Sequence, residues 1–178
     1  AGNKVTNLRE YIQKEMSVRG VACVCLRCRE YGRQLKQYPE LAADVPQLFV
    51  DEYETSGGRE FFLSFEDSSR RAVYAFLRLR ISGAQDEKLI SLMPEIQDAA
   101  FIRELHTYGH VVPLGEHASG TATQHKGLGR KLMKHAEEIA GMQGAKKILV
   151  ISGIGVIEYY KKLGYDHEGT YMSKLLNF

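Results

Sequence analysis

A glycine-containing turn at the start of a helical pattern is the stretch of this sequence with the most specific chemistry. Its residues are Gln124-His125-Lys126-Gly127-Leu128-Gly129, and apolar residues recur at the helical period from Leu128 to Ala140. Gly127 and Gly129 carry no Cβ, so the backbone can bend tightly and bring unpaired N–H groups close to an anion. Because the positive end of the helix dipole lies at the same place, the turn predicts a phosphate-binding site.

The turn differs from two common phosphate-binding loops. It lacks the Gly-Lys-Ser/Thr ending of a nucleotide-hydrolysing loop and the Gly-x-Gly-x-x-Gly spacing of a dinucleotide-binding fold. The alternative is a helix that begins with glycines only for close packing, because a motif of six residues is short. Whether the turn binds a phosphate or only allows close packing has to be inferred from the elements around it.

A cluster of three cysteines suggests a second site. Cys23, Cys25 and Cys28 lie within six positions and are all the cysteines of the chain. In a chain without signs of secretion, this spacing favours a metal site over disulfides. Structural zinc takes four ligands, so one position is left unfilled. The alternative is three reduced, partly buried cysteines on a strand.

The N-terminal segment is basic, although the whole chain has a net charge of only +2. Residues 1–37 carry a net charge of +5, which leaves −3 for the remainder. Arg27, Arg29 and Arg33, with Tyr31 among them, form a basic patch with one aromatic ring. Such a patch can hold a phosphate backbone and stack a base, which points to a nucleic acid partner. A solvated charged face is the alternative.

Length and composition exclude several classes of protein. A chain of 178 residues, 44% of them hydrophobic, suits one domain with an appendage. No apolar run approaches the ~18 residues of a membrane span, and the N-terminus has no signal segment. We therefore expect a soluble cytoplasmic protein with no membrane partner.

The patterns around the turn predict an antiparallel meander followed by a crossover. Short polar turns separate strands at residues 48–53, 60–65 and 72–81, and a longer strand covers 101–112. The helix after the turn leads to a strand at 146–151, a short helix at 155–163 and two last strands at 165–168 and 171–176. Near the N-terminus, Asn7 is expected to cap a helix that ends at Gly20, and residues 38–46 read as a connection. These patterns predict a basic linker with the cysteine cluster at 1–45 and a main domain at 46–178.

The order of these elements resembles the GNAT acetyltransferases, which hold acetyl-coenzyme A (acetyl-CoA). The Gln-x-x-Gly-x-Gly turn matches the pyrophosphate loop of that family, and Glu158–Tyr165 matches its last signature, an aromatic-Tyr pair before a Gly-Tyr. The resemblance covers about residues 46–178. It implies an α+β fold with a mixed, mostly antiparallel sheet flanked by helices.

Further matches narrow the resemblance to the catalytic subunit of Elongator, a family that modifies the wobble uridine of tRNA. They are Cys25–Glu30, Arg103–Gly109, Gln124-His125, Val150–Gly155 and Gly164-Tyr165. The resemblance implies a tRNA acetyltransferase domain that acts in a carboxymethyl-type modification. It also implies a radical-SAM domain, with an iron–sulfur cluster and S-adenosylmethionine, that these residues cannot supply, and Elongator-type subunits as partners. The start without methionine favours a fragment over a stand-alone relative.

The resemblance also assigns roles to single residues. In the cofactor site, the residues are Gln124, Gly127, Leu128, Gly129 and Arg130 for the pyrophosphate, Glu104, Leu105, His106 and Thr107 for the pantetheine arm, and Tyr160 at the sulfur. A phenol with a pKa of about 10 remains a proton donor at neutral pH, so Tyr160 is expected to protonate the leaving thiolate. Tyr159 is ambiguous, and core packing is the alternative for both tyrosines.

Two residues of the strand before the turn are candidates for the general base. Glu104 and His106 lie on one face if the strand alternates regularly. Either could instead satisfy a buried hydrogen bond. The acceptor of the acetyl group also stays open: a protein lysine is the alternative to tRNA, and a non-catalytic module that binds zinc and tRNA is the alternative to an enzyme.

Overall fold

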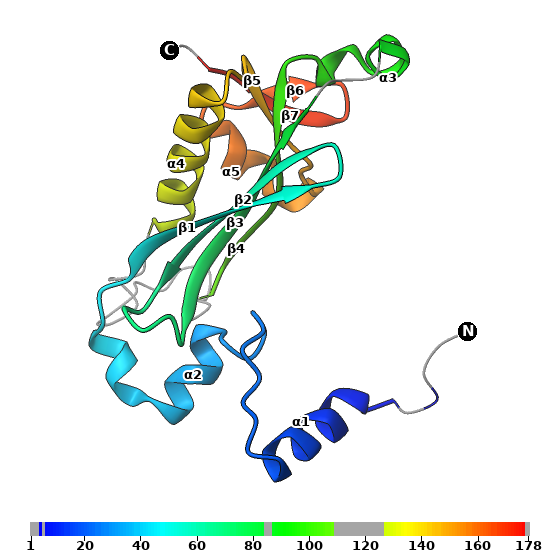
Figure 1. The fold of residues 1–178 in the computed structure, drawn as a ribbon. Coiled ribbons are helices and arrows are strands. Elements are labelled where there is room, and N and C mark those ends of the chain that lie inside the picture. The colour runs from blue at the N-terminus through cyan, green and yellow to red at the C-terminus, as the bar shows by residue number, and fades with distance from the viewer. Residues whose placement is uncertain (1–3, 5, 84–86, 109–126, 177–178) are drawn as a thin grey trace.

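One mixed sheet organises the part of the chain that the computed structural model describes, which comprises residue 4 and residues 6–83, 87–108 and 127–176. Its order is β1-β2-β3-β4-β5-β7-β6 (Figure 1). The strands are β1 (Gln47–Thr55), β2 (Gly58–Glu66), β3 (Val73–Ser82), β4 (Ala99–Thr107), β5 (Lys147–Val150), β6 (Asp166–Glu168) and β7 (Tyr171–Leu175). The helices are α1 (Leu8–Val18), α2 (Tyr31–Gln37), α3 (Glu87–Leu92), α4 (Leu128–Met142) and α5 (Ile157–Lys161).

Strand pairing confirms the predicted meander and crossover. β1 to β4 pair antiparallel in sequence order, whereas β4 and β5 pair parallel. A parallel pair needs a crossover connection, and α4 lies in the segment that supplies it. β7 and β6 then extend the sheet antiparallel beyond β5.

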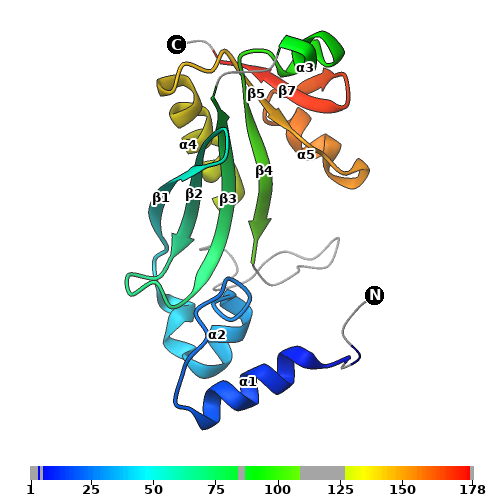
Figure 2. The same ribbon diagram turned by 45° about the vertical axis from the view of Figure 1, so that its right-hand side comes forward.

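Helix α4 buries its apolar stripe against one face of the sheet, and in Figure 2 it lies behind strands β1 to β3. Leu132, Met133, Ala136 and Ala140 of this helix are buried. They belong to one cluster with apolar side chains of the strands, among them Leu63, Leu77, Leu79 and Ile102. Their spacing of three and four residues produces this stripe, which explains why the helical pattern could be read from the sequence.

The opposite face of the sheet holds a buried carboxylate among arginines. Glu60 is 1% exposed, accepts hydrogen bonds from Arg78 (2.9 Å) and Tyr53 (3.0 Å), and is also contacted by Arg103. Burial by itself would raise the pKa of Glu60, but these hydrogen bonds outweigh it and hold the pKa at about 2. The carboxylate is therefore ionised at neutral pH and fixes the arginines on this face.

A second buried carboxylate ties the N-terminal segment to β2. Glu66 is fully buried and forms ion pairs with Arg29 and Arg70, while the Ser64 hydroxyl donates to it at 2.6 Å. The N–H of Val73 also donates to the carbonyl of Arg29 at 2.6 Å. The segment after the cysteines is thus joined to the sheet by both side chains and backbone.

Residues that the sequence suggested were a linker and connection contribute to the core of the sheet. Tyr31 and Leu41 are buried in the same cluster as Tyr74, whose ring centroid lies 4.7 Å from that of Tyr31. Tyr31 begins α2, and Leu41 lies in a short 3-10 helix at Pro39–Ala43. The division at residues 45 and 46 stays a prediction, but packing joins residues 31–43 to the sheet.

The alternative that placed the three cysteines on a strand does not hold, because Val21–Arg29 forms no strand; the cysteine segment turns at residues 25–29, where the N–H of Cys28 donates to the carbonyl of Cys25 at 2.9 Å. Two local expectations were wrong. The side chain of Asn7 does not cap α1 and instead donates to Glu10 at 3.4 Å. The strand expected at 101–112 is β4, which ends at Thr107, and residues 109–126 lie outside the described part.

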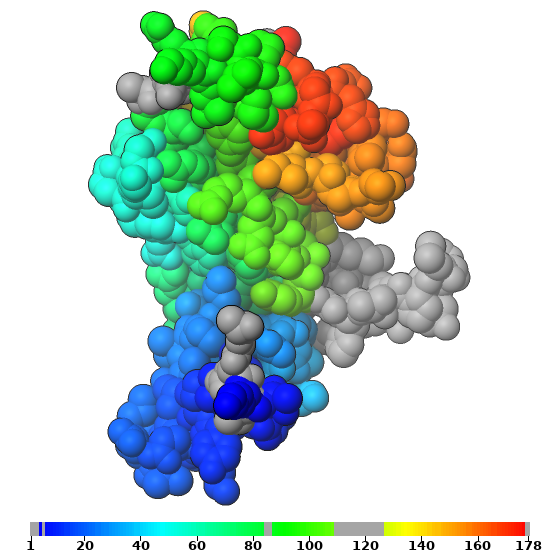
Figure 3. All heavy atoms as spheres, turned by 90° about the vertical axis from the view of Figure 1, so that its right-hand side faces the viewer, coloured from blue at the N-terminus to red at the C-terminus, as the bar shows by residue number. Residues whose placement is uncertain are grey.

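Helix α1 differs from the other long helix because it buries none of its residues. Figure 3 shows the N-terminal segment, in blue, at one end of the molecule and α3 with the last strands at the other. Among the described helices, none combines the length and the apolar character that a bilayer crossing requires.

We expect Glu66→Gln to destabilise the fold much more than a surface change of the same kind. Loss of the buried charge leaves Arg29 and Arg70 without their shared carboxylate, which costs about 3 kcal/mol in comparable buried pairs. Glu52→Gln is the control, because Glu52 pairs with Arg59 at 2.8 Å on the surface, where such pairs contribute less than about 1 kcal/mol. Urea unfolding of both variants measures the difference, and equal losses would contradict the role of Glu66.

Candidate active site

An opening between β4 and β5 is created by their unequal lengths. The two strands pair from Ala99 and Lys147 to Ile102 and Val150, and β5 ends there. β4 continues through residues 103–107, paired with β3 on one side but not with β5 on the other. Backbone groups along this free edge are available to a ligand that carries amides, as in β-strand addition.

A bulge at Arg103 sets which side chains face the opening. Arg78 pairs with Glu104 and Leu79 with Ile102, so Arg103 is the extra residue of β4. Such a bulge disturbs the alternation of side chains along the strand. Arg103 contacts Glu60 and Glu104 lies 3.6 Å from Arg78, so both neighbours lie on the face opposite α4.

Beyond the bulge, alternation resumes and divides the predicted site residues between two faces. Leu105 packs against the core that α4 covers, and Thr107 lies near Gly129 of α4. Glu104 and His106 lie on the other face, with the carboxylate 3.1 Å from the imidazole Nε2. The prediction that these two share a face is confirmed in geometry, although the bulge was not foreseen.

Backbone directions in β4 follow from one hydrogen bond. The N–H of Tyr108 donates to the carbonyl of Tyr74 at 2.7 Å. In an antiparallel pair, alternate residues direct their N–H and C=O groups toward the partner strand. Residues 104, 106 and 108 therefore face β3, whereas Leu105 and Thr107 direct their backbone groups into the opening.

The start of α4 lies beside this free edge. Gly127 is its N-cap, with a left-handed φ of 82°, and the first helical N–H is that of Lys131, which donates to the Gly127 carbonyl at 3.0 Å. The amides of Leu128, Gly129 and Arg130 precede this bond and so lack a partner within the helix. Gln124, with His125 and Lys126, lies outside the described residues.

Gly129 is the point where three elements meet. A Cβ on this residue would lie 2.9 Å from the hydroxyl of Tyr159 and 3.2 Å from the methyl group of Thr107. Since real Cβ atoms essentially never come within 3.0 Å of another atom, glycine permits the close approach of the Tyr159 hydroxyl. The start of α4, the end of β4 and helix α5 converge around it.

The two tyrosines of α5 have different environments. Tyr160 is 7% exposed, and its ring packs edge-on against Tyr159 (5.3 Å) and Tyr165 (6.0 Å). Burial raises the pKa of Tyr160, so its phenol is protonated at neutral pH. Tyr159 is 37% exposed; burial raises its pKa, and the nearby Arg130 opposes that effect.

Sequence reasoning did not find the support behind Tyr160. The hydroxyl of Tyr165 donates to Glu137 of α4 at 2.9 Å, and Lys174 of β7 donates to the same carboxylate at 2.8 Å. This network links α4 to the turn after α5. The Gly164-Tyr165 signature was the available signal, but Glu137 has no marker in the sequence.

The three cysteine sulfurs are gathered as a metal site requires. They lie within 4.8 Å of one another. Arg9 of α1 approaches Cys28 at 3.1 Å and Cys25 at 3.7 Å, and its hydrogen bond lowers the pKa of Cys25 to about 6. Three thiolates fit zinc in chemistry and spacing, and no further histidine, cysteine or acidic residue joins them in the described ranges.

The arginines of the predicted nucleic acid patch do not form a single surface. Arg29 is 18% exposed because its guanidinium pairs with Glu66. Arg27 is exposed, and Arg33 is 49% exposed with Glu30 at 3.7 Å. The structure thus separates an inward-facing arginine from two accessible ones.

Comparison with known proteins agrees with this architecture. The profile of the acetyltransferase (GNAT) family matches residues 43–165, more than half of the chain. The chain therefore belongs to the GNAT acetyltransferase family. The predicted fold class and the predicted acyltransferase class are confirmed at this level.

More specific similarity is found to longer proteins. The chain is 44% identical to "tRNA uridine(34) acetyltransferase" of Methanocaldococcus jannaschii over 98% of its own length and 32% of that relative. It is 41% identical to "Elongator complex protein 3" of Saccharomyces cerevisiae over 94% of its length and 30% of that relative. A solved structure of Methanocaldococcus infernus Elp3 with an N-terminal deletion superposes with a TM-score of 0.75 at 43% identity, covering 97% of this chain and 40% of that one. The chain spans about a third of the length of these curated relatives.

The contact at Gly129 predicts energetic coupling with Tyr159. Alanine favours a helix over glycine by about 1 kcal/mol, but here its Cβ collides with the Tyr159 hydroxyl. Tyr159→Phe removes that hydroxyl. Gly129→Ala should therefore be more favourable for stability in the Tyr159→Phe variant than in the parent, with a coupling energy of about 1 kcal/mol. A double-mutant cycle of unfolding free energies measures it.

Gly153→Ala provides the control cycle, because a Cβ there meets nothing within 4 Å. It should combine additively with Tyr159→Phe. Additivity in the Gly129 cycle as well would show that the close contact is absent in solution.

Proposed function

We propose that this chain is the acetyl-CoA-dependent acetyltransferase part of an enzyme that modifies uridine 34, the wobble uridine, of tRNA. The observation that carries the proposal is the convergence of the α4 N-terminus, the free edge of β4 and the α5 tyrosines at Gly129. Similarity to proteins named for tRNA uridine(34) acetylation supports the choice of substrate.

The pyrophosphate of acetyl-CoA binds at the start of α4. The amides of Leu128, Gly129 and Arg130 have no helical acceptor, and the helix dipole adds partial positive charge at this end. The exposed Arg130 side chain supplies a full charge next to the amides. We also assign Gln124 to this loop, on the motif alone.

The pantetheine arm lies along the free edge of β4. Its amides pair with the backbone groups of Leu105 and Thr107, which are directed into the opening. The side chains of Glu104 and His106 point to the opposite face. These two residues therefore contribute to the site of the arm only as members of the strand, not through their side chains. This arrangement directs the thioester toward α5.

Tyr160 protonates the departing thiolate. Its raised pKa keeps the proton on the phenol until the sulfur leaves. Glu104 and His106 accept the proton of the incoming acceptor; their contact at 3.1 Å lets the carboxylate orient the imidazole. Tyr159 positions the cofactor through its contact with Gly129.

Arg27 and Arg33 hold phosphates of the tRNA, since both side chains are accessible. Arg29 serves the same surface indirectly by anchoring the segment to Glu66. The curated relatives are about three times as long as this chain. We assign to such further sequence the radical-SAM domain, with its iron–sulfur cluster and S-adenosylmethionine, that attaches carbon to the base in a carboxymethyl-type reaction.

This division of labour has consequences for the chain alone. In the presence of tRNA it cleaves the acetyl-CoA that it binds, but it does not complete the modification of uridine. Elongator-type subunits are the expected protein partners, and the cytoplasm, where tRNA is modified, is the expected location.

The function is tested by mass spectrometry of acetyl-CoA mixed with the chain. Free coenzyme A should appear when tRNA is present and not without it. Tyr160→Phe should keep the affinity for acetyl-CoA and slow thioester cleavage by about 10²-fold, as expected for loss of a general acid. Tyr11→Phe is the matched control, because Tyr11 is 70% exposed on α1.

Two results would reject parts of this proposal. Transfer of acetyl groups to lysine peptides, with no effect of tRNA, would identify a protein acetyltransferase instead. If Tyr160→Phe turns over normally, Tyr160 is not the general acid, but the proposed cofactor site stands.

The cysteine cluster is proposed to bind zinc through Cys23, Cys25 and Cys28, with a solvent molecule or a group from outside this chain as the fourth ligand. Metal analysis of protein purified without chelator should find close to one zinc per chain, and Cys25→Ser should lower the amount. A thiol reagent should modify the sulfurs only after a chelator is added. Absence of metal together with freely reactive thiols would argue against the site.

A further inference from the structure

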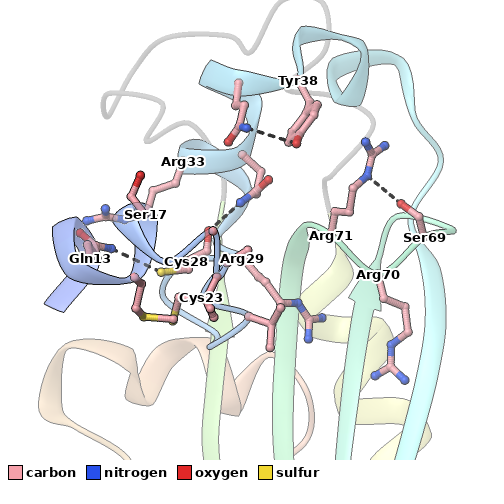
Figure 4. Close-up of a pocket in the computed structure, with 17 residues that line it drawn as sticks. Gln13, Ser17, Cys23, Cys28, Arg29, Arg33, Tyr38, Ser69, Arg70 and Arg71 are labelled. Carbon is pink, nitrogen blue, oxygen red and sulfur yellow. Dashed lines mark hydrogen bonds between the residues drawn. The ribbon is translucent and has the colours of Figure 1, made fainter.

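A large cleft in the described part of the chain has no residue of α4 or α5 in its lining (Figure 4). It has a volume of about 780 Å³ and is formed by α1, the cysteine segment, α2 and the turn between β2 and β3. Its polar lining residues are Gln13, Ser17, Arg29, Arg33, Gln34, Gln37, Tyr38, Ser69, Arg70 and Arg71. We name it the arginine cleft.

The lining of the arginine cleft is rich in hydrogen-bond donors and contains no acidic side chain. Four arginines line it from two sides, Arg29 and Arg33 from the cysteine segment and α2, and Arg70 and Arg71 from the β2–β3 turn. Arginine binds phosphate in two-pronged geometry, so such a lining suits a ligand with several phosphates.

Carboxylates behind the cleft hold these arginines without using all their donors. Arg70 pairs with two carboxylates, the fully buried Glu66 and Asp51, whereas Arg71 lies 3.6 Å from Asp67, which is 2% exposed. A guanidinium has five N–H donors, so the single carboxylate near Arg71 leaves other donors of Arg71 available. Arg33 and Arg71 are 49% and 45% exposed and so can meet a ligand from solvent.

The cleft also offers surfaces for a base and a sugar. The guanidinium of Arg71 lies over the ring of Tyr38, with its carbon 4.7 Å from the ring centroid, which is a cation–π contact. Bases in single-stranded RNA stack on such aromatic and guanidinium planes. Side-chain amides and hydroxyls, including those of Gln37 and Ser69, can both donate and accept, as base edges and 2′-hydroxyls require.

Strand register connects the cleft to the candidate active site. The β2–β3 turn leads into the start of β3, and Ala75 near that start pairs with Thr107 at the end of β4. Thr107 in turn contacts Gly129 of α4. The arginine cleft and the cofactor-binding elements therefore lie at the same end of the sheet, where one extended ligand can reach both.

We propose that the arginine cleft binds a single-stranded segment of RNA, with phosphates between Arg33 and Arg71 and a base stacked on the Arg71–Tyr38 pair. Charge favours this occupant, because the lining holds four arginines and no carboxylate, and the sulfurs of Cys23 and Cys28 that also line it are the zinc ligands proposed above. The proposal rests on the proposed RNA substrate and adds a contact surface that the basic patch in the sequence did not include. Arg70 and Arg71 lie in the β2–β3 turn, far along the chain from that patch.

Binding of tRNA and of a single-stranded RNA oligonucleotide to the chain, measured by fluorescence anisotropy at several salt concentrations, tests the proposal. The double variant Arg33→Gln/Arg71→Gln should bind both RNAs at least tenfold more weakly. Its salt slope should fall by about 1.5, since two phosphate contacts are lost. Arg71→Lys should recover only part of the affinity, because lysine keeps the charge and loses the planar stack.

Arg59→Gln is the control for loss of one arginine charge outside the cleft, half of the change in the double variant. Arg59 is on the surface near the other end of β2, where it pairs with Glu52. Its RNA affinity should stay within twofold of the parent. Unchanged acetyl-CoA affinity and unfolding midpoint in the double variant verify that its fold is intact.

The outcomes separate this proposal from the proposed function. If the double variant binds RNA with the parent's affinity and salt slope while tRNA still triggers release of coenzyme A, the cleft assignment is wrong and the function stands. If the parent binds no RNA, both are wrong. Inorganic pyrophosphate and a mononucleotide can each be tested as competitors of the oligonucleotide. If both displace it at the same concentration, the cleft is a site for free anions and the RNA assignment fails.

Discussion

The short pairing between β4 and β5 is the constraint on which the candidate site depends. β5 has four residues and β4 has nine, so the parallel pair closes only part of the edge of β4. Full pairing would leave no backbone groups free for an amide-rich ligand. The left-handed conformation at Gly127 and the missing side chain at Gly129 then let the start of α4 approach that edge. The site is therefore a product of strand length and backbone conformation more than of special side chains.

Buried carboxylates organise the face of the sheet that α4 does not cover. Glu60 gathers Arg78, Arg80 and Arg103, and Glu66 gathers Arg29 and Arg70. Charges are costly to bury unless they are paired and hydrogen-bonded, so each carboxylate fixes the positions of its arginines. These pairs therefore keep the arginine side chains at defined positions on that face of the sheet.

Features set by local chemistry could be read from the sequence. The glycine turn, the apolar stripe of α4 and the polar turns of the meander each depend on neighbouring residues, and each is present. Features set by distant partners could not. Helix α2 has seven residues and depends on contact between Tyr31 and Tyr74, and the bulge at Arg103 changes the pairing by one residue. Charge alone likewise could not distinguish Arg29, which faces Glu66, from the accessible Arg27.

Helix α1 has eleven residues, none of them buried, which is below the ~12–15 residues at which isolated helices become stable in water. Apart from bonds to the flanking residues Asn7 and Arg19, the side-chain hydrogen bonds of α1 to other described residues go to the sulfurs of Cys25 and Cys28. Its helix–coil equilibrium is therefore thermodynamically linked to the chemical state of those sulfurs. Metal binding, protonation or oxidation of these sulfurs therefore also changes the helicity of residues 8–18, so circular dichroism and amide exchange of α1 become indirect reporters of thiol chemistry.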